Sequence, residues 1–330
     1  MPTPRPADHS RATARKMRAV GLYEYGGPDV LRIVHLPEPH AGAGQVRVQV
    51  RAAAVNPADV MLRDGRLREW YQDAEPPFIP GMDIAGTIDE IGPDVDPQLG
   101  LAIADEVVGI VDNHGQHGGY SEHVVLDARS VTAKPAHADF ETAASFLMNS
   151  LTARTALDAL ALPPGACLLV TGAAGAFGGY VVQLAAADGL RVIALASAQD
   201  EGLVRSLGAH DVVFRGADLA RGIREITPHA VDAVADGAVL NELVYPTIRD
   251  GGQVAAVIGG GKAPGRGIHV HAVNVRTRVT DHPAITTLGH SAAAGRIALR
   301  VAATFPAQDA ADAHRLLSHA GVRGRIILRW

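Results

Sequence analysis

The sequence has 330 residues, 47% of them apolar and 20% charged, which is enough for about two domains with sizeable cores. The formal net charge of −5 argues against a nucleic-acid-binding protein, because phosphate recognition requires clustered Lys and Arg. The single cysteine, Cys167, excludes a disulfide framework and any metal site built from several cysteines. No apolar run is long enough to cross a membrane, and residues 1–16 are polar and proline-rich, so we expect a disordered tail on a cytoplasmic protein.

From Met17 to about Lys134 the sequence predicts a β-rich domain. Residues Gln45–Ala54 alternate polar and apolar side chains, as a half-buried strand does. Ile84–Ile91 and Glu106–Val111 are further predicted strands, and Gly, Pro and Asp separate them. Many short strands joined by turns are typical of a barrel or a sandwich.

From about residue 140 the pattern changes to strands that alternate with helices. A helical stretch over Phe140–Leu162 ends at Pro163, because proline cannot continue the hydrogen-bond ladder. A second helix is predicted over Gly179–Ala187. The predicted strands are Ala166–Thr171, Arg191–Ala196, Val212–Phe214, Val231–Ala235 and Gln253–Ile258. The alternation indicates a parallel sheet with helices on both faces. From about Arg296 the pattern changes again to a strand-like piece, a helix around Ala307–Ala320 and a final strand, Gly324–Arg329.

The turn between the first two of these strands carries a glycine pattern typical of dinucleotide-binding proteins. Gly172 allows a tight turn, Gly175 lets the backbone approach a pyrophosphate, and Gly178 lets helix and strand pack closely. An ordinary glycine turn is the alternative, and the strand–turn–helix context argues against it. The predicted cofactor-binding residues of this turn are Gly172, Ala173, Ala174, Gly175, Ala176, Phe177 and Gly178.

The residue after the second strand, Ser197, bears on the choice of cofactor. An NAD site usually has an acid there to bind the ribose 2′-hydroxyl, and the first acid after this strand is Asp200. NADPH is therefore favoured over NADH. Ser197 with Asp200 and Glu201 fits a helix capping box equally well, and Arg205 lies further along the same helix.

Several motifs occur in a fixed order along the chain. They are Val55-Asn56-Pro57-Ala58-Asp59 with Arg63-Asp64-Gly65, Ile79 to Gly86, Asp105-Glu106-Val107, Gly118 to Glu122, Leu151-Thr152-Ala153, Ala313 to Leu317 and Gly321 to Ile326. Together they resemble the zinc-independent, quinone-oxidoreductase-like branch of the medium-chain dehydrogenase/reductase superfamily. The resemblance implies an α/β protein with a GroES-like β-barrel catalytic domain (residues 17–139 and 296–330) and a Rossmann NADP-binding domain (residues 140–295). Its active site would lie in the cleft between the two.

The resemblance also implies roles for individual residues. Asn56 would lie beside the nicotinamide and the substrate carbonyl, and Thr152 would pack near the nicotinamide ring. The backbone of Ile258, Gly259 and Gly260 would contact the carboxamide. From the residues alone, Asn56 could equally be a turn residue before a proline, and Thr152 an ordinary helix residue.

The chain departs from the zinc-dependent members of the superfamily it resembles at the metal ligands. Met82 stands where those relatives have a zinc-binding histidine, so we expect no catalytic metal. The pairs His114/His117 and His269/His271 come with no further apparent ligand, and solvated histidines are the favoured interpretation.

A second departure concerns the proton donor. Several relatives have a tyrosine shortly after the active-site asparagine, and residues 59–62 contain none. Tyr71 is the candidate replacement, followed by His114 and His117.

These features predict a zinc-independent oxidoreductase that uses NADPH to reduce a quinone or the conjugated C=C of an enone. Two alternatives remain open: an NADP-dependent alcohol or ketone oxidoreductase, and a non-catalytic NADPH-binding protein. A short-chain dehydrogenase is excluded, because no tyrosine has a lysine four residues later. Ile268–Val275 alternates like an edge strand, which favours a homodimer.

Overall fold

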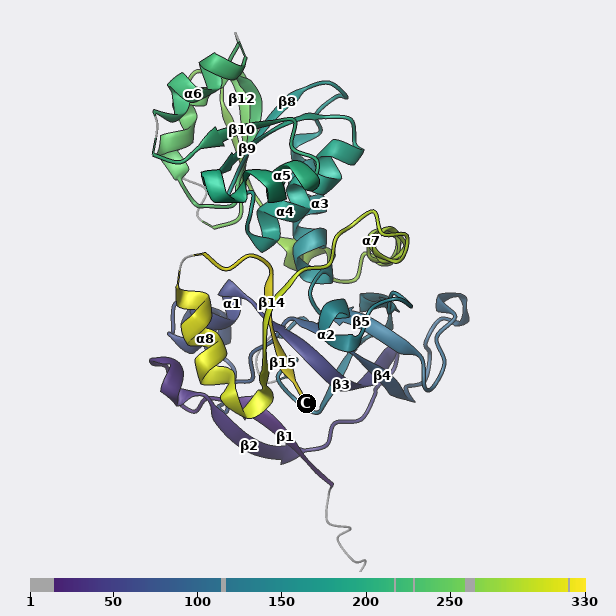
Figure 1. Ribbon diagram of the computed structural model, residues 1–330. Helices are drawn as coiled ribbons and strands as arrows, with labels where there is room; N and C mark the ends of the chain where they lie inside the picture. Colours follow the sequence, from purple (N-terminus) through teal and green to yellow (C-terminus); the bar gives the residue numbers. More distant parts are fainter. Residues whose placement is uncertain (1–14, 114–116, 217, 228, 259–264, 320) are drawn as a thin grey trace, which may run out of the picture.

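The structure is a computed structural model, and it describes residues 15–113, 117–216, 218–227, 229–258, 265–319 and 321–330. Two lobes are stacked one on the other (Figure 1), and the C-terminal segment returns to the lobe that contains the first strands. No helix within these ranges has both the length and the apolar character needed to cross a bilayer.

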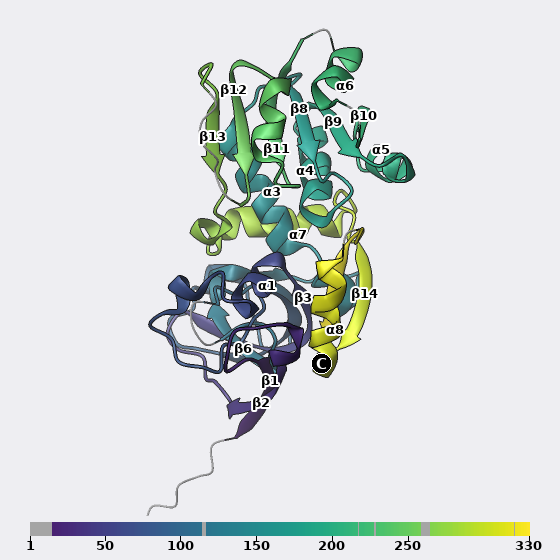
Figure 2. The ribbon, with the colours of Figure 1, turned by 90° about the vertical axis from the view of Figure 1, so that its left-hand side faces the viewer.

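The first lobe, called the barrel lobe from here on, is built on a largely antiparallel sheet and lies below the other lobe in Figure 2. Its strands pair in the order β14-β15-β3-β4-β5-β7, and β6 pairs with β3. A separate hairpin of β1 and β2 lies beside it. The elements are β1 (Lys16–Gly21), β2 (Arg32–Pro37), β3 (Gln45–Val55), α1 (Pro57–Arg63), β4 (Asp83–Ile91), β5 (Glu106–Ile110), β6 (His123–Asp127), β7 (Val131–Ala133), α2 (Phe140–Ala143), β14 (Val301–Pro306), α8 (Ala310–Ser318) and β15 (Arg325–Arg329).

The second lobe is a parallel sheet covered by helices. Its strand order is β10-β9-β8-β11-β12-β13. The chain adds β9 and β10 on one side of β8 and then adds β11 to β13 on the other side, which is the arrangement of a dinucleotide-binding fold. The elements are α3 (Leu147–Leu160), β8 (Cys167–Thr171), α4 (Ala176–Ala187), β9 (Arg191–Ala196), α5 (Glu201–Ser206), β10 (Asp211–Phe214), α6 (Leu219–Ile226), β11 (Val231–Asp236), β12 (Ile248–Ala256), β13 (His269–Ala272) and α7 (His282–Ala293).

Both faces of the parallel sheet are buried, which explains its continuous apolar strands. Side chains alternate along a strand, so Leu168 and Val170 of β8 join the core under α3 and α4. Leu169 points to the other face and joins the core under α6. The prediction of a parallel sheet with helices on both faces is confirmed.

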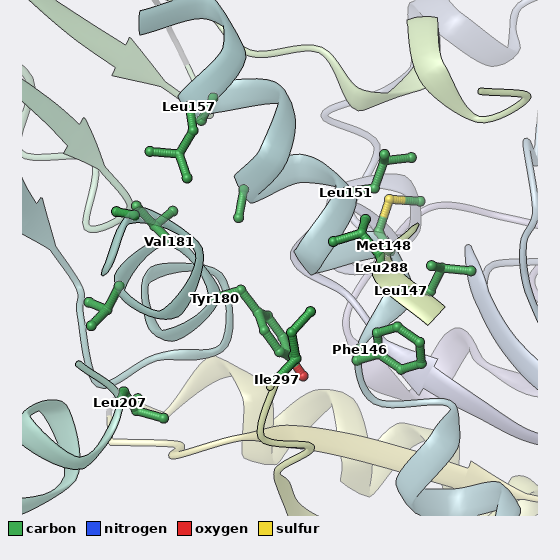
Figure 3. Packing of buried hydrophobic residues seen from close by; sticks show 14 of the residues in the cluster. Phe146, Leu147, Met148, Leu151, Leu157, Tyr180, Val181, Leu207, Leu288 and Ile297 are labelled. Carbon is green, nitrogen blue, oxygen red and sulfur yellow. The ribbon is translucent and has the colours of Figure 1, made fainter. Parts of the chain in front are cut away.

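One continuous apolar core runs through the junction of the two lobes. It joins residues of the barrel strands to the start of α3, to α4 and to α7. Figure 3 shows part of it, with Phe146 and Leu147 at the beginning of α3, Tyr180 on α4 and Ile297 on the returning chain. This packing fixes the first turn of α3 between the lobes.

Three predicted boundaries were wrong. The predicted helix over Phe140–Leu162 is two helices, α2 and α3, which three buried residues, Ala144, Ser145 and Phe146, separate. The helix predicted from Gly179 begins at Ala176, so the last glycines of the turn lie in its first turn. Lys16, assigned to a disordered tail, is the first residue of β1 and pairs with Pro37, while residues 1–14 lie outside the described ranges.

The predicted domain limits at 139/140 and 295/296 remain a prediction. The helix α2 lies just after the first limit and contacts β3 and β4 of the barrel.

Candidate functional site

The three glycines of the predicted motif lie in a closely packed turn. Gly172 directly follows β8 with φ +62°, a left-handed conformation that favours glycine. A Cβ on Gly178 would lie 2.3 Å from the carbonyl oxygen of Gly172, so helix and turn touch there. Gly175 immediately precedes α4, whose free N–H groups and dipole favour an anion.

The other predicted residues of this turn have distinct positions. Ala173 and Ala174 are buried in the core, Ala176 is the first residue of α4, and Phe177 packs against the core from the helix. Arg300, from the returning chain, donates to the carbonyl oxygens of Ala174 (3.1 Å) and Gly175 (2.7 Å). Sequence reasoning missed Arg300, because it lies more than a hundred residues away.

A cavity of 590 Å³ opens at the carboxyl ends of the parallel strands, beside this turn. It lies where the strand order reverses, which is where ligands bind in open α/β sheets. Its mostly apolar wall fits the flat ring of a nucleotide base. The lining residues are Gly172, Leu195, Phe214, Arg215, Gly216, Asp218, Leu219, Ala220, Ala238, Leu240, Leu243 and Pro246. The close-packed turn and the adjoining cavity fit a nicotinamide dinucleotide.

Ser197 lies at the end of β9 in an ionic cluster. Its hydroxyl donates to Asp200 Oδ2 at 2.5 Å, and no capping hydrogen bond forms, so the capping-box alternative was wrong. The Arg323 guanidinium binds both Asp200 oxygens and holds the pKa of that carboxyl at about 2. Arg215 Nη2 lies 3.9 Å from the same carboxylate. Arg205 is turned away, toward Glu201 and the His210 carbonyl.

Asn56 is buried at the point where β3 turns into α1. Its backbone N–H donates to Asp59 Oδ2 at 2.8 Å, and the other Asp59 oxygen accepts from Gly81 N, also at 2.8 Å. Pro57 starts the helix with a backbone angle that suits a first helical position. The carboxylate of Asp59 thus fixes the turn that carries Asn56. Burial raises the pKa of Asp59 to about 6, although these two N–H donors oppose the shift.

A second buried carboxylate, Asp83, connects Asn56 to the parallel-sheet lobe. The Asn56 side chain hydrogen-bonds to Asp83, whose Oδ1 accepts from Met148 N at 2.8 Å. Arg325 Nη2 lies 3.3 Å from Asp83 Oδ2. Burial raises the pKa of Asp83 to about 6, against the effect of Arg325. Asn56 therefore lies where the barrel meets the first turn of α3.

Thr152 lies one turn further along α3. Its hydroxyl donates to the Met148 carbonyl oxygen at 2.6 Å, which brings the Asn56 turn and the Thr152 turn into one connected group. Asn149, in the turn between them, has a buried Nδ2 with no hydrogen-bond partner among the described residues. A buried donor without an acceptor is costly, so this amide fits a carbonyl group of a bound molecule.

Tyr71 is buried in the barrel lobe, with 3% of its surface exposed. Its ring lies edge-on to Phe78, and its hydroxyl hydrogen-bonds to Arg276 of the other lobe. Burial raises the pKa of the Tyr71 phenol to about 12. Arg276 also binds Asp112 Oδ1 at 2.8 Å and lies 5.1 Å from the centre of the Trp70 ring, so one side chain bridges the lobes.

The remaining predicted residues lie apart from this group or outside the described ranges. Ile258 follows the end of β12 and is 43% exposed. Gly259, Gly260 and His114 fall outside the described residues.

Met82 is buried, with Asp83 next to it in the sequence. Among the residues with described positions, no group of three or more His, Cys, Asp or Glu side chains could hold a metal ion. The expectation that the protein uses no catalytic metal stays a prediction.

Sequence comparison identifies relatives across most of the chain. The family profile "Alcohol dehydrogenase GroES-like domain" matches residues 42–136, and "Zinc-binding dehydrogenase" matches residues 207–328. The NADPH-dependent alkenal/one oxidoreductase of Arabidopsis thaliana is 31% identical over 76% of this chain and 65% of its own length. The quinone oxidoreductase of Lama guanicoe is 27% identical over 95% of this chain and 98% of its own.

Structural comparison agrees with the sequence matches. The crystal structure of an NAD-dependent alcohol dehydrogenase superposes with a TM-score of 0.81, at 29% identity, over 95% of this chain and 100% of its own. A mycobacterial quinone oxidoreductase gives a TM-score of 0.79 at 26% identity, over 95% of this chain and 100% of its own. The expected combination of a GroES-like domain and a Rossmann domain is confirmed. The chain belongs to the medium-chain dehydrogenase/reductase superfamily, with homologues among its quinone oxidoreductases and alkenal reductases.

Proposed function

We propose that this oxidoreductase uses NADPH to reduce a quinone or the conjugated C=C of an enone. The observation that carries the proposal is the position of Asn56, hydrogen-bonded through Asp83 to the turn of α3 that precedes Thr152. An amide donor thus lies at the lobe junction, on the barrel side of the dinucleotide fold. The similarity to an alkenal/one oxidoreductase and to a quinone oxidoreductase supports the same reaction class.

The cofactor would lie along the carboxyl ends of the parallel strands. Gly172 to Gly178 would approach its pyrophosphate, and the 590 Å³ cavity would take the adenine. Ser197, Arg215 and Arg323, which all contact Asp200, would together bind a ribose 2′-phosphate, which is why we propose NADPH. When bound, the nicotinamide supplies a hydride to an electrophilic carbon.

The chain's own residues would orient the substrate and stabilise developing charge. Asn56 would donate from its amide to the substrate carbonyl oxygen, which becomes negative as the β-carbon is reduced. Asp59 holds the backbone N–H of Asn56 and Asp83 holds its side chain, so the residue is already oriented. Asn56 Nδ2 also donates to the Ala54 carbonyl oxygen over 3.4 Å, and the substrate oxygen would replace this long hydrogen bond. We propose water as the source of the α-carbon proton, because Tyr71 is buried between Phe78 and Arg276.

A labelled cofactor tests the reaction. NADPH deuterated at the transferable C4 position is incubated with the protein and a panel of enones and quinones. We expect deuterium on the β-carbon of a reduced enone, located by NMR. Deuterium on a carbinol carbon with the C=C intact would show an alcohol or ketone oxidoreductase instead. NADPH binding without turnover of any substrate would favour the non-catalytic alternative.

We further propose a cytoplasmic homodimer that forms through β13. This strand pairs with β12 on one side and ends the described strand order, and an open strand edge is a natural pairing surface. Light scattering at micromolar concentration should give twice the monomer mass. A proline at Val270 should shift the protein toward monomer, and a monomeric native protein would contradict the proposal.

A further inference from the structure

A buried line of polar side chains leads from α8 to the Asn56 turn. Tyr120 Oη lies 3.2 Å from Asp59 Oδ2 and also 3.2 Å from His314 Nε2. Arg63 Nη1 lies 3.4 Å from His314 Nδ1, and Arg63 Nε donates to the Gly26 carbonyl oxygen. These side chains are at most 6% exposed. Tyr120, His314 and Arg63 were not predicted site residues, and the reaction proposed above does not use them.

The donor groups fix the direction of every hydrogen bond in this line. Arginine has only donors, so Arg63 donates to His314 Nδ1, which must be the acceptor. A neutral ring then has its proton on Nε2 and donates it to Tyr120 Oη. Burial, with the adjacent Arg63 charge, lowers the pKa of His314 to about 3, which agrees with a neutral ring. The single Tyr120 proton is left for Asp59.

We propose that Tyr120 and His314 are positioning residues that hold Asn56 in place through Asp59, as a one-way series of donors from Arg63 to the Asp59 carboxylate. Asp59 receives three donors: Asn56 N, Gly81 N and the Tyr120 hydroxyl. Removal of the hydroxyl leaves one carboxylate lone pair unpaired in a fully buried site, which loosens the turn. The proposal rests on the proposed function, because Asn56 is assigned there to the substrate carbonyl.

The same geometry gives Tyr120 an influence on pH dependence. The charged and titratable groups that face Asp59 are Arg325 from β15, Tyr120 from the loop before β6, and Tyr71, whose pKa Asp59 helps to raise. Arg325 and Tyr120 favour the charged carboxylate. Three donors point at the Asp59 carboxylate, and a proton on that carboxyl would repel one of them. The turn is therefore stable only while Asp59 is ionised. Loss of the Tyr120 hydroxyl should therefore move the acid side of the activity profile to higher pH.

Four variants test this proposal. Tyr120→Phe removes only the hydroxyl, and Tyr180→Phe is its matched control, since Tyr180 is equally buried and donates to the Ser145 carbonyl oxygen outside this line. His314→Gln keeps an amide donor and an acceptor, whereas His314→Leu has neither. The measurements are kcat and KM for an enone as functions of pH, the NADPH dissociation constant from fluorescence, and hydrogen–deuterium exchange at the amide of Asn56.

We expect Tyr120→Phe and His314→Leu to lower kcat about tenfold with NADPH affinity unchanged. The acid side of the kcat profile should move to higher pH in Tyr120→Phe and stay in place in Tyr180→Phe. His314→Gln should retain kcat within about threefold of the native protein. Equal pH profiles for the two folded tyrosine variants, or equal kcat for His314→Gln and His314→Leu, would overturn the proposal.

The exchange measurement separates this proposal from the proposed function. If the native protein reduces no enone or quinone, the proposed function fails and the line of donors is still tested. Faster exchange of the Asn56 amide in Tyr120→Phe than in Tyr180→Phe then supports it. Equal rates in the two variants contradict it.

Discussion

Arg323 and Asp200 form a bidentate ion pair that ties the C-terminal segment of the barrel lobe to the parallel sheet. Arg323 Nε lies 2.5 Å from Asp200 Oδ1, and Nη2 lies 2.6 Å from Oδ2. Arg215 approaches the same carboxylate from the end of β10. Two guanidinium groups thus surround one carboxylate beside the Ser197 hydroxyl, which leaves an excess of positive charge where we propose that a ribose 2′-phosphate binds.

Replacement of Arg323 by glutamine should weaken NADPH binding about tenfold and leave NADH binding nearly unchanged. The reason is that only NADPH carries the phosphate that this guanidinium would bind. Arg205→Gln is the matched control, because Arg205 points to Glu201 and the His210 carbonyl oxygen and takes no part in the Ser197–Asp200 cluster. Titrations followed by fluorescence measure both dissociation constants. An equal loss of affinity for both cofactors would contradict the assignment.

A new acid at Ser197 tests the proposed 2′-phosphate site by adding negative charge to it. Ser197→Asp places a second carboxylate beside Asp200, so it should repel the 2′-phosphate and favour NADH. The ratio of the NADPH and NADH dissociation constants, measured in one buffer, should invert relative to the native protein. Equal affinity of the native protein for both cofactors would remove the basis of this prediction.

The close contact between Gly178 and the turn predicts a steric effect. A Cβ on residue 178 would meet the Gly172 carbonyl oxygen at 2.3 Å, so Gly178→Ala should destabilise the fold by about 1–3 kcal/mol and weaken cofactor binding strongly. Gly202, in α5, is the control, because a Cβ there has no atom within 4 Å. Gly202→Ala should stabilise the protein by about 0.5–1 kcal/mol. Urea unfolding measures both changes, and similar effects at the two positions would contradict this account.

The buried pair of Asp83 and Arg325 predicts a pH-dependent stability. Burial raises the folded-state pKa of Asp83 from 3.8 to about 6, so the folded protein binds a proton more tightly than the unfolded chain. The stabilisation of the folded state by this carboxyl is therefore fully present below about pH 4, and it is lost as the pH rises through about 6.

Asp83→Asn removes this titration and serves as the comparison. The free energy of unfolding of the native protein, minus that of Asp83→Asn, should increase by roughly 2 kcal/mol as the pH falls from about 7 to about 4. Denaturant unfolding at a series of pH values measures the difference, and general acid effects cancel because both proteins share them. A constant difference across this range would show that Asp83 keeps an ordinary pKa.

Local patterns predicted the dinucleotide fold well. The buried strands and the turn at Gly172 depend on neighbouring residues, and the structure has them at nearly the predicted positions. The break between α2 and α3 escaped prediction, because Ala144, Ser145 and Phe146 include no proline or glycine that would mark the end of a helix.

The polar contacts of the site were not predictable from the sequence in the same way. Tyr120 and Asp59 are 61 positions apart, and Arg63 and His314 are 251 apart. The sequence around Asp200 fits a local helix cap, yet the structure pairs Asp200 with Arg323, 123 positions away. A local sequence pattern cannot distinguish a cap or a solvated charge from a long-range ion pair. The motif containing Asn56 and Asp59 did predict a site, but it did not predict that Tyr120 and His314 would lie next to it.

Removal of the Asn56 amide tests the centre of the proposed site. Asn56→Ala keeps the backbone N–H that donates to Asp59 and removes the side-chain donor, so the turn should persist while the substrate oxygen loses its hydrogen bond. One such donor contributes about 2.7–4 kcal/mol to lowering a barrier, so kcat for an enone should fall about 10²–10³-fold. The NADPH dissociation constant should change little, because the predicted pyrophosphate contacts lie at Gly172 to Gly178.

Asp139→Ala is the control for loss of a helix cap. Asp139 caps α2 through Thr142 N, away from the site, so its loss should reduce stability by about 1 kcal/mol with kcat unchanged. If Asn56→Ala retains kcat within about threefold of the native value, the substrate carbonyl is bound by another donor. The next candidate is the buried Asn149 Nδ2, for which the described residues offer no acceptor.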